Sequence, residues 1–262
     1  ASTDSSHAVY EKHKSDSRIR ILKNDKNRGC GYTKRKCVEN AKGDICGFVD
    51  ADDIISSSAL EKMIFQHNIN LDHSIIYSTY YNCDQLLKPI TVSDQVGQIE
   101  PTKYSWMNQH PMISHFATFK RAKYLQTSGI TAWLQKAVDK DLYYKLEETG
   151  PVLFINEPLY YYRHHSHSIS LNKNASLAYQ FHLTIKAMIV LRAKERKLTL
   201  KIMPHSKAQL NGGMIIVGLS LLPTCYFLNG LGLLLKSLWF FNLQSLSYLP
   251  KLFMKYFSRR NQ

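Results

Sequence analysis

Short apolar runs alternate with amphipathic segments along the first 160 residues of the chain. Turn-forming or polar residues bound the apolar runs, as they bound buried strands, and the segments between them carry apolar residues at helical spacing. This alternation predicts a layered α/β domain. The predicted strands are Arg18–Leu22, Ile45–Val49, Ser74–Tyr80, Phe116–Lys120, Val152–Ile155 and Leu159–Tyr162, and the predicted helices are Lys34–Ala41, a segment from Ser58 to about Asn68, and Leu142–Glu148.

One of these helices has a recognisable beginning. Ser56–Ser58 can cap its first turn, because serine side chains accept hydrogen bonds from free backbone N–H groups. The helical period places four residues on one face, which we expect to be buried. They are Leu60, Met63, Ile64 and His67.

The last third of the chain has a different pattern. Ala175–Lys197 predicts a long connecting helix with a basic end, and Ala208–Leu235 contains no charged residue. A continuous helix of that length would span roughly 42 Å, more than the ~30 Å hydrocarbon core, but Pro223 interrupts it. Lys236–Tyr256 is typical of an interfacial amphipathic helix. We therefore expect a helical membrane-associating segment, attached as a hairpin or along the surface, with a buried hairpin packed on the domain as the alternative.

Composition and charge narrow the class of protein. The chain has 262 residues and a formal net charge of +14, with basic clusters at Lys26–Lys42, Arg192–Lys207 and Lys251–Arg260. A basic surface attracts polyanions, and the last two clusters flank the apolar stretch, which favours an anionic membrane surface as a partner. No zinc-finger, RNP or helix-turn-helix signature accompanies the charge, so nucleic acid is not an expected partner. Five cysteines without CxxC spacing favour a reducing compartment.

The most informative residues follow the second predicted strand. Gly47-Phe48-Val49 leads directly into Asp50-Ala51-Asp52-Asp53, so carboxylates gather at the C-terminal end of a strand, where open α/β sheets bind ligands. Hard oxygen ligands at this density suit Mg²⁺ or Mn²⁺, which keep positions open for phosphate oxygens. The alternative is an acidic N-terminus for the helix that follows. We favour a site for a divalent cation and a diphosphate.

Six segments in order resemble motifs of the family 2 glycosyltransferases with the GT-A fold. The resemblance runs from about residue 1 to about residue 170. It rests on Ala1–Ser6, which is similar to the end of "DDGSTD"; Asn27-Arg28-Gly29 with Ala41–Asp44; Phe48–Asp53, which is similar to "flDaDD"; Phe119-Lys120-Arg121; Ala137–Leu142, at the place of "aEDydL"; and Glu157–His165 with Ser168–Ser170, which is similar to "epLy.YR.h..SiS".

The resemblance implies a Rossmann-like mixed sheet flanked by helices. It also implies an inverting transfer of a sugar from a nucleotide-sugar donor to a saccharide or lipid-linked acceptor, and we expect the donor to be UDP-linked. By position in the motifs, Asp50 and Asp52 would hold Mn²⁺ or Mg²⁺ and the diphosphate, and Asp139 would be the general base. His165 would bind the metal or the diphosphate. Lys34 would replace the family's Arg near the donor. Asn27 and Gly29 complete the donor-binding residues that the motifs imply.

Alternatives for two residues and for the whole chain stay open at the level of sequence. Asp139 also fits a helix N-terminal carboxylate, and His165 a structural histidine. The family's first strand and nucleotide-base strand have no counterpart in residues 1–262, so we expect a piece of a longer gene product, and a non-catalytic binding module is a second interpretation. A basic membrane-surface adaptor is a third.

Three further expectations concern organisation and placement. The sequence divides into a catalytic domain at residues 1–170, a connector at 171–207 and a membrane-associating segment at 208–262. That arrangement predicts peripheral or hairpin attachment to the cytoplasmic face of the cell membrane. Acceptor choice is expected to lie in Asp84–Ser114, which includes Trp106 and His110.

Overall fold

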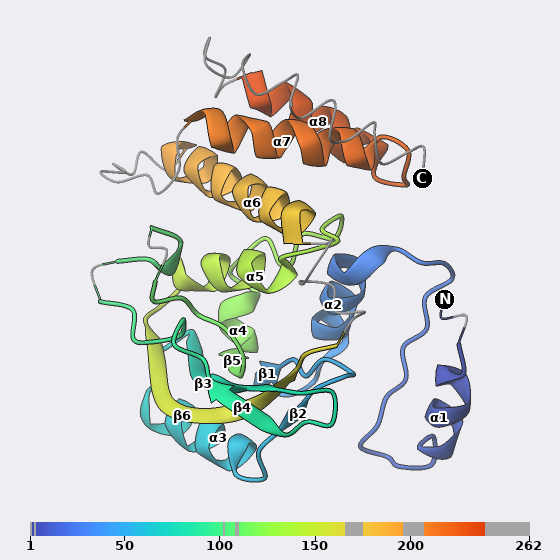
Figure 1. The fold of residues 1–262 in the computed structure, drawn as a ribbon, viewed down its shortest axis with the longest axis vertical. Coiled ribbons are helices and arrows are strands. Elements are labelled where there is room, and N and C mark those ends of the chain that lie inside the picture. Colours follow the sequence, from blue (N-terminus) through green and yellow to red (C-terminus); the bar gives the residue numbers. More distant parts are fainter. Residues whose placement is uncertain are drawn as a thin grey trace.

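The computed structural model shows an α/β domain below and the stacked helices α6 (Ala175–Glu195), α7 (Lys207–Leu221) and α8 (Phe227–Ser237) above (Figure 1). It describes residue 2 and residues 4–101, 103–107, 110–165, 175–195 and 207–238. The two parts meet where helix α5 (Val138–Glu147) lies beside helix α6 (Ala175–Glu195).

A mixed sheet forms the centre of the domain. The strand order is β1-β5-β3-β6-β2, with β4 paired to the outer part of β3. Strand β5 is antiparallel to both β1 and β3, and β6 is parallel to β3, so β1, β3 and β6 all end at the same edge of the sheet. The beginning of β5 lies at that edge too. The strands are β1 (Ile45–Gly47), β2 (Ile54–Ile55), β3 (Ile75–Cys83), β4 (Pro89–Val92), β5 (Ala117–Lys120) and β6 (Val152–Arg163).

Helices cover both faces of the sheet (Figure 1). One face carries α3 (Ala59–Ile69), whose Met63 packs into a cluster with Ile76 and Tyr160. The other face carries α2 (Gly29–Asn40), the short α4 (Arg121–Tyr124) and α5. The apolar and β-branched sequence of β3 suits this position, since its first five residues are buried.

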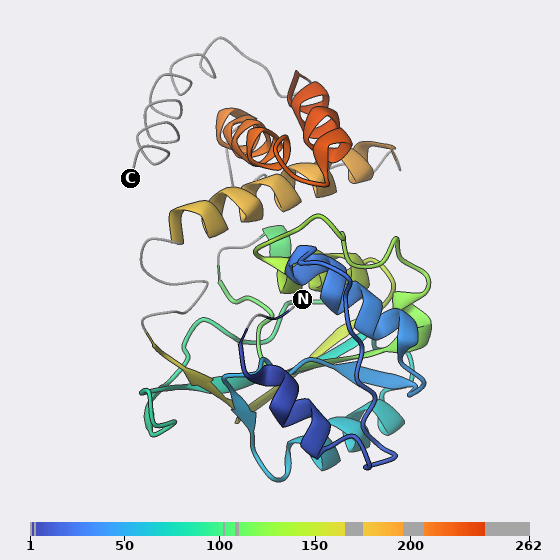
Figure 2. The same cartoon turned by 90° about the vertical axis from the view of Figure 1, so that its right-hand side faces the viewer.

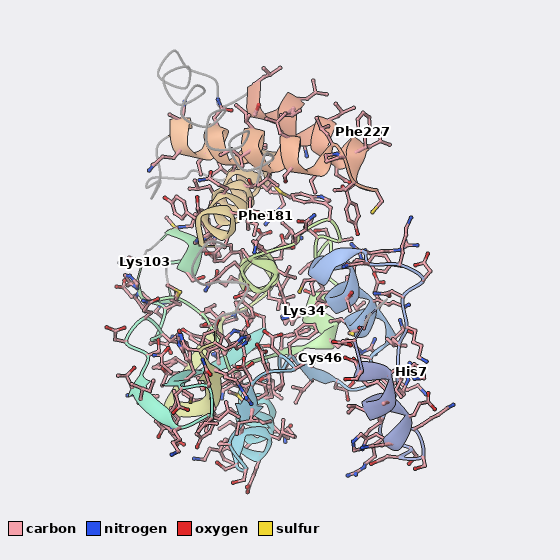
Figure 3. All side chains as sticks on the ribbon, turned by 45° about the vertical axis from the view of Figure 1, so that its right-hand side comes forward. His7, Lys34, Cys46, Lys103, Phe181 and Phe227 are labelled. Atoms are coloured by element: carbon pink, nitrogen blue, oxygen red, sulfur yellow. The ribbon has the colours of Figure 1, made fainter. Side chains whose placement is uncertain are left out.

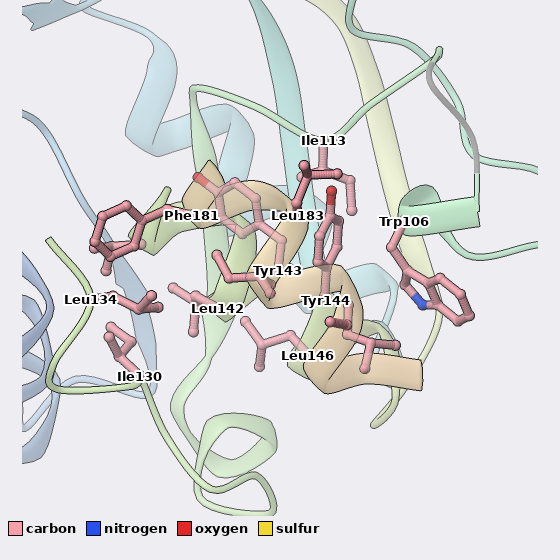
Figure 4. Close-up of a cluster of buried hydrophobic side chains, with 14 of the residues drawn as sticks. Trp106, Ile113, Ile130, Leu134, Leu142, Tyr143, Tyr144, Leu146, Phe181 and Leu183 are labelled. Carbon is pink, nitrogen blue, oxygen red and sulfur yellow. The ribbon is translucent and has the colours of Figure 1, made fainter. Parts of the chain in front are cut away.

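Figure 4 shows how α5 is fixed in place. Its Leu142, Tyr143, Tyr144 and Leu146 are buried, between Ile130 and Leu134 of the preceding loop and Phe181 and Leu183 of α6. Polar groups on α5 are buried as well. Lys145 forms an ion pair with Asp141 at 2.8 Å, with side-chain exposures of 4% and 2%. The helix therefore presents its first turn to the site from a rigid position.

The structure corrects several predicted elements. Arg18–Leu22 is not a strand: it pairs with no strand in the described part of the chain, and Arg18 instead binds the Asp16 carboxylate at 2.7 Å. Helix α2 begins earlier than expected, at Gly29, and β6 is one strand where the sequence indicated two.

The buried face of α3 also differs from the prediction. The helix meets the sheet through Ala59, Met63 and His67, a row at i, i+4 and i+8, while Leu60 and Ile64 stay 54% and 46% exposed. The hydrogen bond from the His67 ring to the Thr118 hydroxyl, at 3.1 Å, fixes that orientation. Ser58 occupies the N-cap position but makes no side-chain capping hydrogen bond.

The uncharged stretch after residue 207 folds as two helices, α7 (Lys207–Leu221) and α8 (Phe227–Ser237), with Pro223 between them. The two helices pack so closely that a Cβ on Gly230 would lie 2.7 Å from the Gly218 carbonyl. Figure 2 shows this hairpin stacked on α6, and the Tyr226 hydroxyl donates to the Arg28 carbonyl at 2.9 Å. None of the helices that the structure describes combines the length and apolar character needed to cross a bilayer. Most of Lys236–Tyr256 lies outside the described residues.

Candidate functional site

The acidic segment lies in a turn at the sheet edge where β1 ends. The Asp53 N–H donates to the Asp50 carbonyl at 3.1 Å, which closes the turn. The turn sends the three carboxylates to different partners. The side chains of Asp50 and Asp52 are 40% and 48% exposed, whereas Asp53 is buried.

Asp50 is paired with Lys34 of α2. The Lys34 ammonium lies 2.9 Å from the Asp50 carboxylate and 5.1 Å from the centre of the Phe48 ring. Burial opposes the charge of Lys34, but Asp50, Cys30 and Asp139 together outweigh that effect, so the pKa of Lys34 is raised. Figure 3 shows Lys34 pointing from α2 toward the sheet. The structure thus brings together two of the residues that the sequence placed in the donor site.

Asp52 is paired with His165, which follows β6. The His165 Nε2 atom lies 2.8 Å from Asp52 Oδ2. A second hydrogen bond joins the two segments, because the Arg163 guanidinium donates to the Asp52 backbone carbonyl at 2.6 Å. A carboxylate oxygen and an imidazole nitrogen at this separation are a donor set that suits Mn²⁺. Within the described part of the chain, no three His, Cys, Asp or Glu side chains converge as a metal site.

Asp53 holds the acidic segment to β6. Its carboxylate accepts a hydrogen bond from the Tyr160 hydroxyl at 2.6 Å and from the Arg163 N–H at 2.8 Å. The Tyr160 hydroxyl in turn accepts from the Asp50 N–H at 3.3 Å. Burial raises the pKa of Asp53 despite these hydrogen bonds. The third carboxylate of the motif is therefore a structural anchor for the other two.

Asp139 lies in the first turn of α5, half-buried, and faces the same group of residues. Burial opposes its ionisation, but Lys140, His115 and Lys34 together lower the pKa of Asp139. Lys34 interacts electrostatically with both Asp50 and Asp139. The predicted base therefore lies within electrostatic reach of Lys34, the residue that pairs with Asp50, even though Asp139 and Asp50 are almost 90 residues apart in sequence.

Asn27 and Gly29 shape the start of α2. The Asn27 side chain accepts from the Gly29 N–H at 3.0 Å, and Gly29 has a φ of +84°, which favours glycine. Two residues on, a Cβ on Gly31 would lie 2.5 Å from the Thr131 carbonyl. This close approach packs α2 against the loop that precedes α5. These residues thereby set the distance between Lys34 and Asp139.

His115, which the sequence did not single out, belongs to the same group. It immediately precedes Phe116 and β5, and its ring stacks on Tyr160 at 4.8 Å between ring centres. Asp139 and Asp50 both act electrostatically on it. Trp106, in contrast, is buried at 3% exposure, so its ring is not an open platform for an acceptor.

The fold is similar to that of a solved structure. A crystal structure of S. aureus TarS 1-349 in complex with UDP-GlcNAc matches with a TM-score of 0.55, at 13% sequence identity, over 86% of this chain and 62% of that one. Such a low identity supports likeness of fold alone. It agrees with the mixed α/β sheet and flanking helices of the GT-A type that the motifs imply.

Sequence comparison points to the same family as the motifs. The glycosyl transferase family 2 profile matches residues 1–127, just under half of the chain. A chondroitin synthase of Escherichia coli is 26% identical over 180 residues, 66% of this chain and 25% of its own length. A hyaluronan synthase of Pasteurella multocida is 24% identical over 180 residues, 66% of this chain and 17% of its own length. The chain thus spans a quarter or less of these two relatives.

Proposed function

We propose that the chain transfers a sugar, with inversion, from a UDP-linked donor to a hydroxyl of a saccharide acceptor. The observation that carries this proposal is the position of Asp139: it lies within electrostatic reach of the Lys34 ammonium, which is paired with Asp50, at the edge of the sheet where Asp52 and His165 also meet. A group that accepts a proton and a group of residues suited to a diphosphate therefore lie side by side.

On the donor side, Asp52 and His165 would hold Mn²⁺ or Mg²⁺, with Asp50 close by. When bound, the cation supplies electrophilic stabilisation of the charge that develops on the departing diphosphate. Lys34, Asn27 and Gly29 contribute without the metal. Lys34 places a positive charge beside Asp50. Asn27 and Gly29 shape the start of the helix that carries Lys34.

On the acceptor side, Asp139 would take the proton from the attacking hydroxyl. Its lowered pKa keeps the carboxylate ionised near neutral pH, and its half-buried position limits competition from water. Inversion requires the base and the leaving group on opposite sides of the reacting carbon. Asp139 and Asp52, on separate elements around one edge of the sheet, support that arrangement.

The acceptor is proposed to be a growing bacterial surface polysaccharide or a lipid-linked oligosaccharide. Support comes from the relatives, whose names are chondroitin synthase and hyaluronan synthase.

Attachment to the cytoplasmic face of the membrane is part of the proposal. Helix α8 exposes an apolar side toward solvent, and Lys236 is exposed beside it. The basic cluster at Lys251–Arg260 follows in sequence. Such a face suits an interfacial contact with anionic lipid. The exposed apolar residues are Phe227, Leu228, Leu231, Leu235 and Leu238.

A screen of UDP-sugars tests the function directly. Mass spectrometry of the full chain, incubated with each UDP-sugar, Mn²⁺ and oligosaccharide acceptors, should reveal a product one sugar longer. UDP binding without turnover of any donor would favour a non-catalytic binding module. Salt-sensitive binding to anionic vesicles, combined with indifference to UDP and Mn²⁺, would favour the membrane-surface adaptor.

A further inference from the structure

His115 lies between the two halves of the proposed site. On one side its ring stacks on Tyr160, at 4.8 Å and an interplanar angle of 17°. The Tyr160 hydroxyl is the group that joins Asp50 to Asp53. His115 is thus one aromatic ring away from the acidic segment.

On the other side, the segment that carries His115 is attached to the start of α5. The Lys140 ammonium donates to the Ile113 carbonyl at 2.7 Å, and Lys140 directly follows Asp139. Strand β5 begins at the edge of the sheet where β1 ends, because the two strands are antiparallel. The topology brings His115 to the sheet edge that carries Asp50, and this hydrogen bond holds the segment before His115 against the start of α5, where Asp139 lies.

The His115 ring is held in orientation but its nitrogens are not used. Tyr160 and Tyr162 lie nearly parallel to it, the latter at 6.0 Å, and Tyr80 approaches edge-on at 6.3 Å. Within the described residues, the ring makes no hydrogen bond. A neutral imidazole offers one donor and one acceptor, the pair that a sugar hydroxyl can satisfy.

The proposed reaction defines what lies at this place. In an in-line displacement, the reacting carbon lies between the leaving diphosphate and the attacking oxygen. Asp52 and His165 would hold the first and Asp139 would deprotonate the second. A side chain midway between them therefore faces the sugar that is transferred.

We propose that His115 binds a hydroxyl of the transferred sugar and so contributes to the choice of donor. The inference rests on the proposed function. It assigns to His115 a contact with the sugar and not with the nucleotide, and it predicts different behaviour toward UDP and toward UDP-sugars.

Two substitutions separate the nitrogens of His115 from its ring. His115→Phe keeps an aromatic ring for Tyr160 and Tyr162 but removes both nitrogens. His115→Asn restores a donor and an acceptor in a smaller side chain. His73→Phe is the matched control, since His73 precedes β3 at the opposite edge of the sheet. All are made in the full chain, with UDP, UDP-glucose, UDP-N-acetylglucosamine and UDP-glucuronate as probes.

The expected result is a loss that depends on the sugar. His115→Phe should bind UDP with Mn²⁺ as the wild type does, while kcat/KM for the accepted UDP-sugar falls roughly 10- to 100-fold, the size of a lost hydrogen bond in a buried site. His115→Asn should recover part of that loss, and His73→Phe should lose nothing. Equal kcat/KM for His115→Phe and wild type, or an equal loss of UDP affinity, overturns the inference.

A spectroscopic measurement on the wild type does not depend on whether a variant folds. The ¹⁵N-labelled ring signals of His115 should shift when the accepted UDP-sugar is added and should stay in place with UDP alone. Shifts of the same size with both ligands contradict the inference. A wild type that binds no UDP and turns over no UDP-sugar overturns the proposed function itself, which keeps the two failures distinct.

Discussion

The imidazole of His165 and the carboxylate of Asp52 meet at 2.8 Å, although 113 residues separate them in the chain. The contact exists because β6 ends at the same edge of the sheet as β1. It joins Glu157–His165, among the segments that resemble the family's motifs, to the acidic segment Asp50–Asp53. Around it lie Lys34 with Asp50 and, within electrostatic reach of both, Asp139.

The pair predicts a shared role in binding Mn²⁺. Asp52→Asn and His165→Ala should each weaken the binding of Mn²⁺ in the presence of UDP by about tenfold or more, because each removes one ligand. Electron paramagnetic resonance of Mn²⁺ measures the free ion directly. Asp94→Asn, an exposed carboxylate in the loop after β4, is the control and should bind as the wild type. Undiminished Mn²⁺ affinity in both site variants would remove the pair from the metal site.

Asp139 is predicted to act in the chemical step alone. Asp139→Asn removes the proton acceptor but keeps the shape and the start of α5. Transfer should therefore drop by about 10²-fold or more, the usual contribution of a general base, while calorimetry with UDP and Mn²⁺ gives the wild-type affinity. Turnover close to that of the wild type would mean that another group deprotonates the acceptor.

The buried ion pair of α5 should be a large contributor to stability. Asp141→Asn leaves the Lys145 ammonium buried without its counter-charge, and we expect the free energy of unfolding to fall by about 3–5 kcal/mol. The double variant Asp141→Leu, Lys145→Met should lose less, because no uncompensated charge remains. Urea unfolding measures both. A single variant as stable as the wild type would show that the charge is relieved by another route.

Glu147 predicts how stability changes with pH. Burial raises the pKa of this carboxyl to about 7, while Ser105 donates two hydrogen bonds of 2.8 Å to it. The folded state therefore holds the proton more tightly than the unfolded state, so this group's contribution to stability is full below about pH 4.5 and is lost as pH rises through about 7.

The measurement is a series of urea midpoints between about pH 5 and about pH 8. Glu147→Gln removes the titration, so its profile should be flatter than that of the wild type and its relative stability should improve toward the alkaline end. If the two profiles run parallel across that range, Glu147 titrates normally in the folded chain.

Local patterns predicted much of the sheet and its acidic turn. The apolar run at Ile45–Val49 predicted the strand, and Asp50 directly after it predicted where the carboxylates lie. Phe116–Lys120 was likewise predicted from its composition and corresponds to β5. The family match covers the same part of the chain, at residues 1–127.

What local patterns could not provide was direction and neighbours. His115 reaches the site only because β5 runs antiparallel to β1, and the sequence does not encode strand direction in any one segment. Arg18–Leu22 alternates like a strand yet has no partner strand beside it. Asp53 is a carboxylate like its two neighbours, but it is buried and its side chain accepts a hydrogen bond from Tyr160. In each case tertiary contacts decided the outcome.

The central claim is that Asp50 and Asp52 form the donor side of an active site in which Asp139 serves the acceptor. Calorimetric titration of the full chain with UDP, once with Mn²⁺ and once with a chelator, tests it most directly. The account predicts saturable binding that depends on Mn²⁺ and that is weakened in Asp52→Asn. UDP binding of equal strength with the chelator, or no binding under either condition, would contradict it.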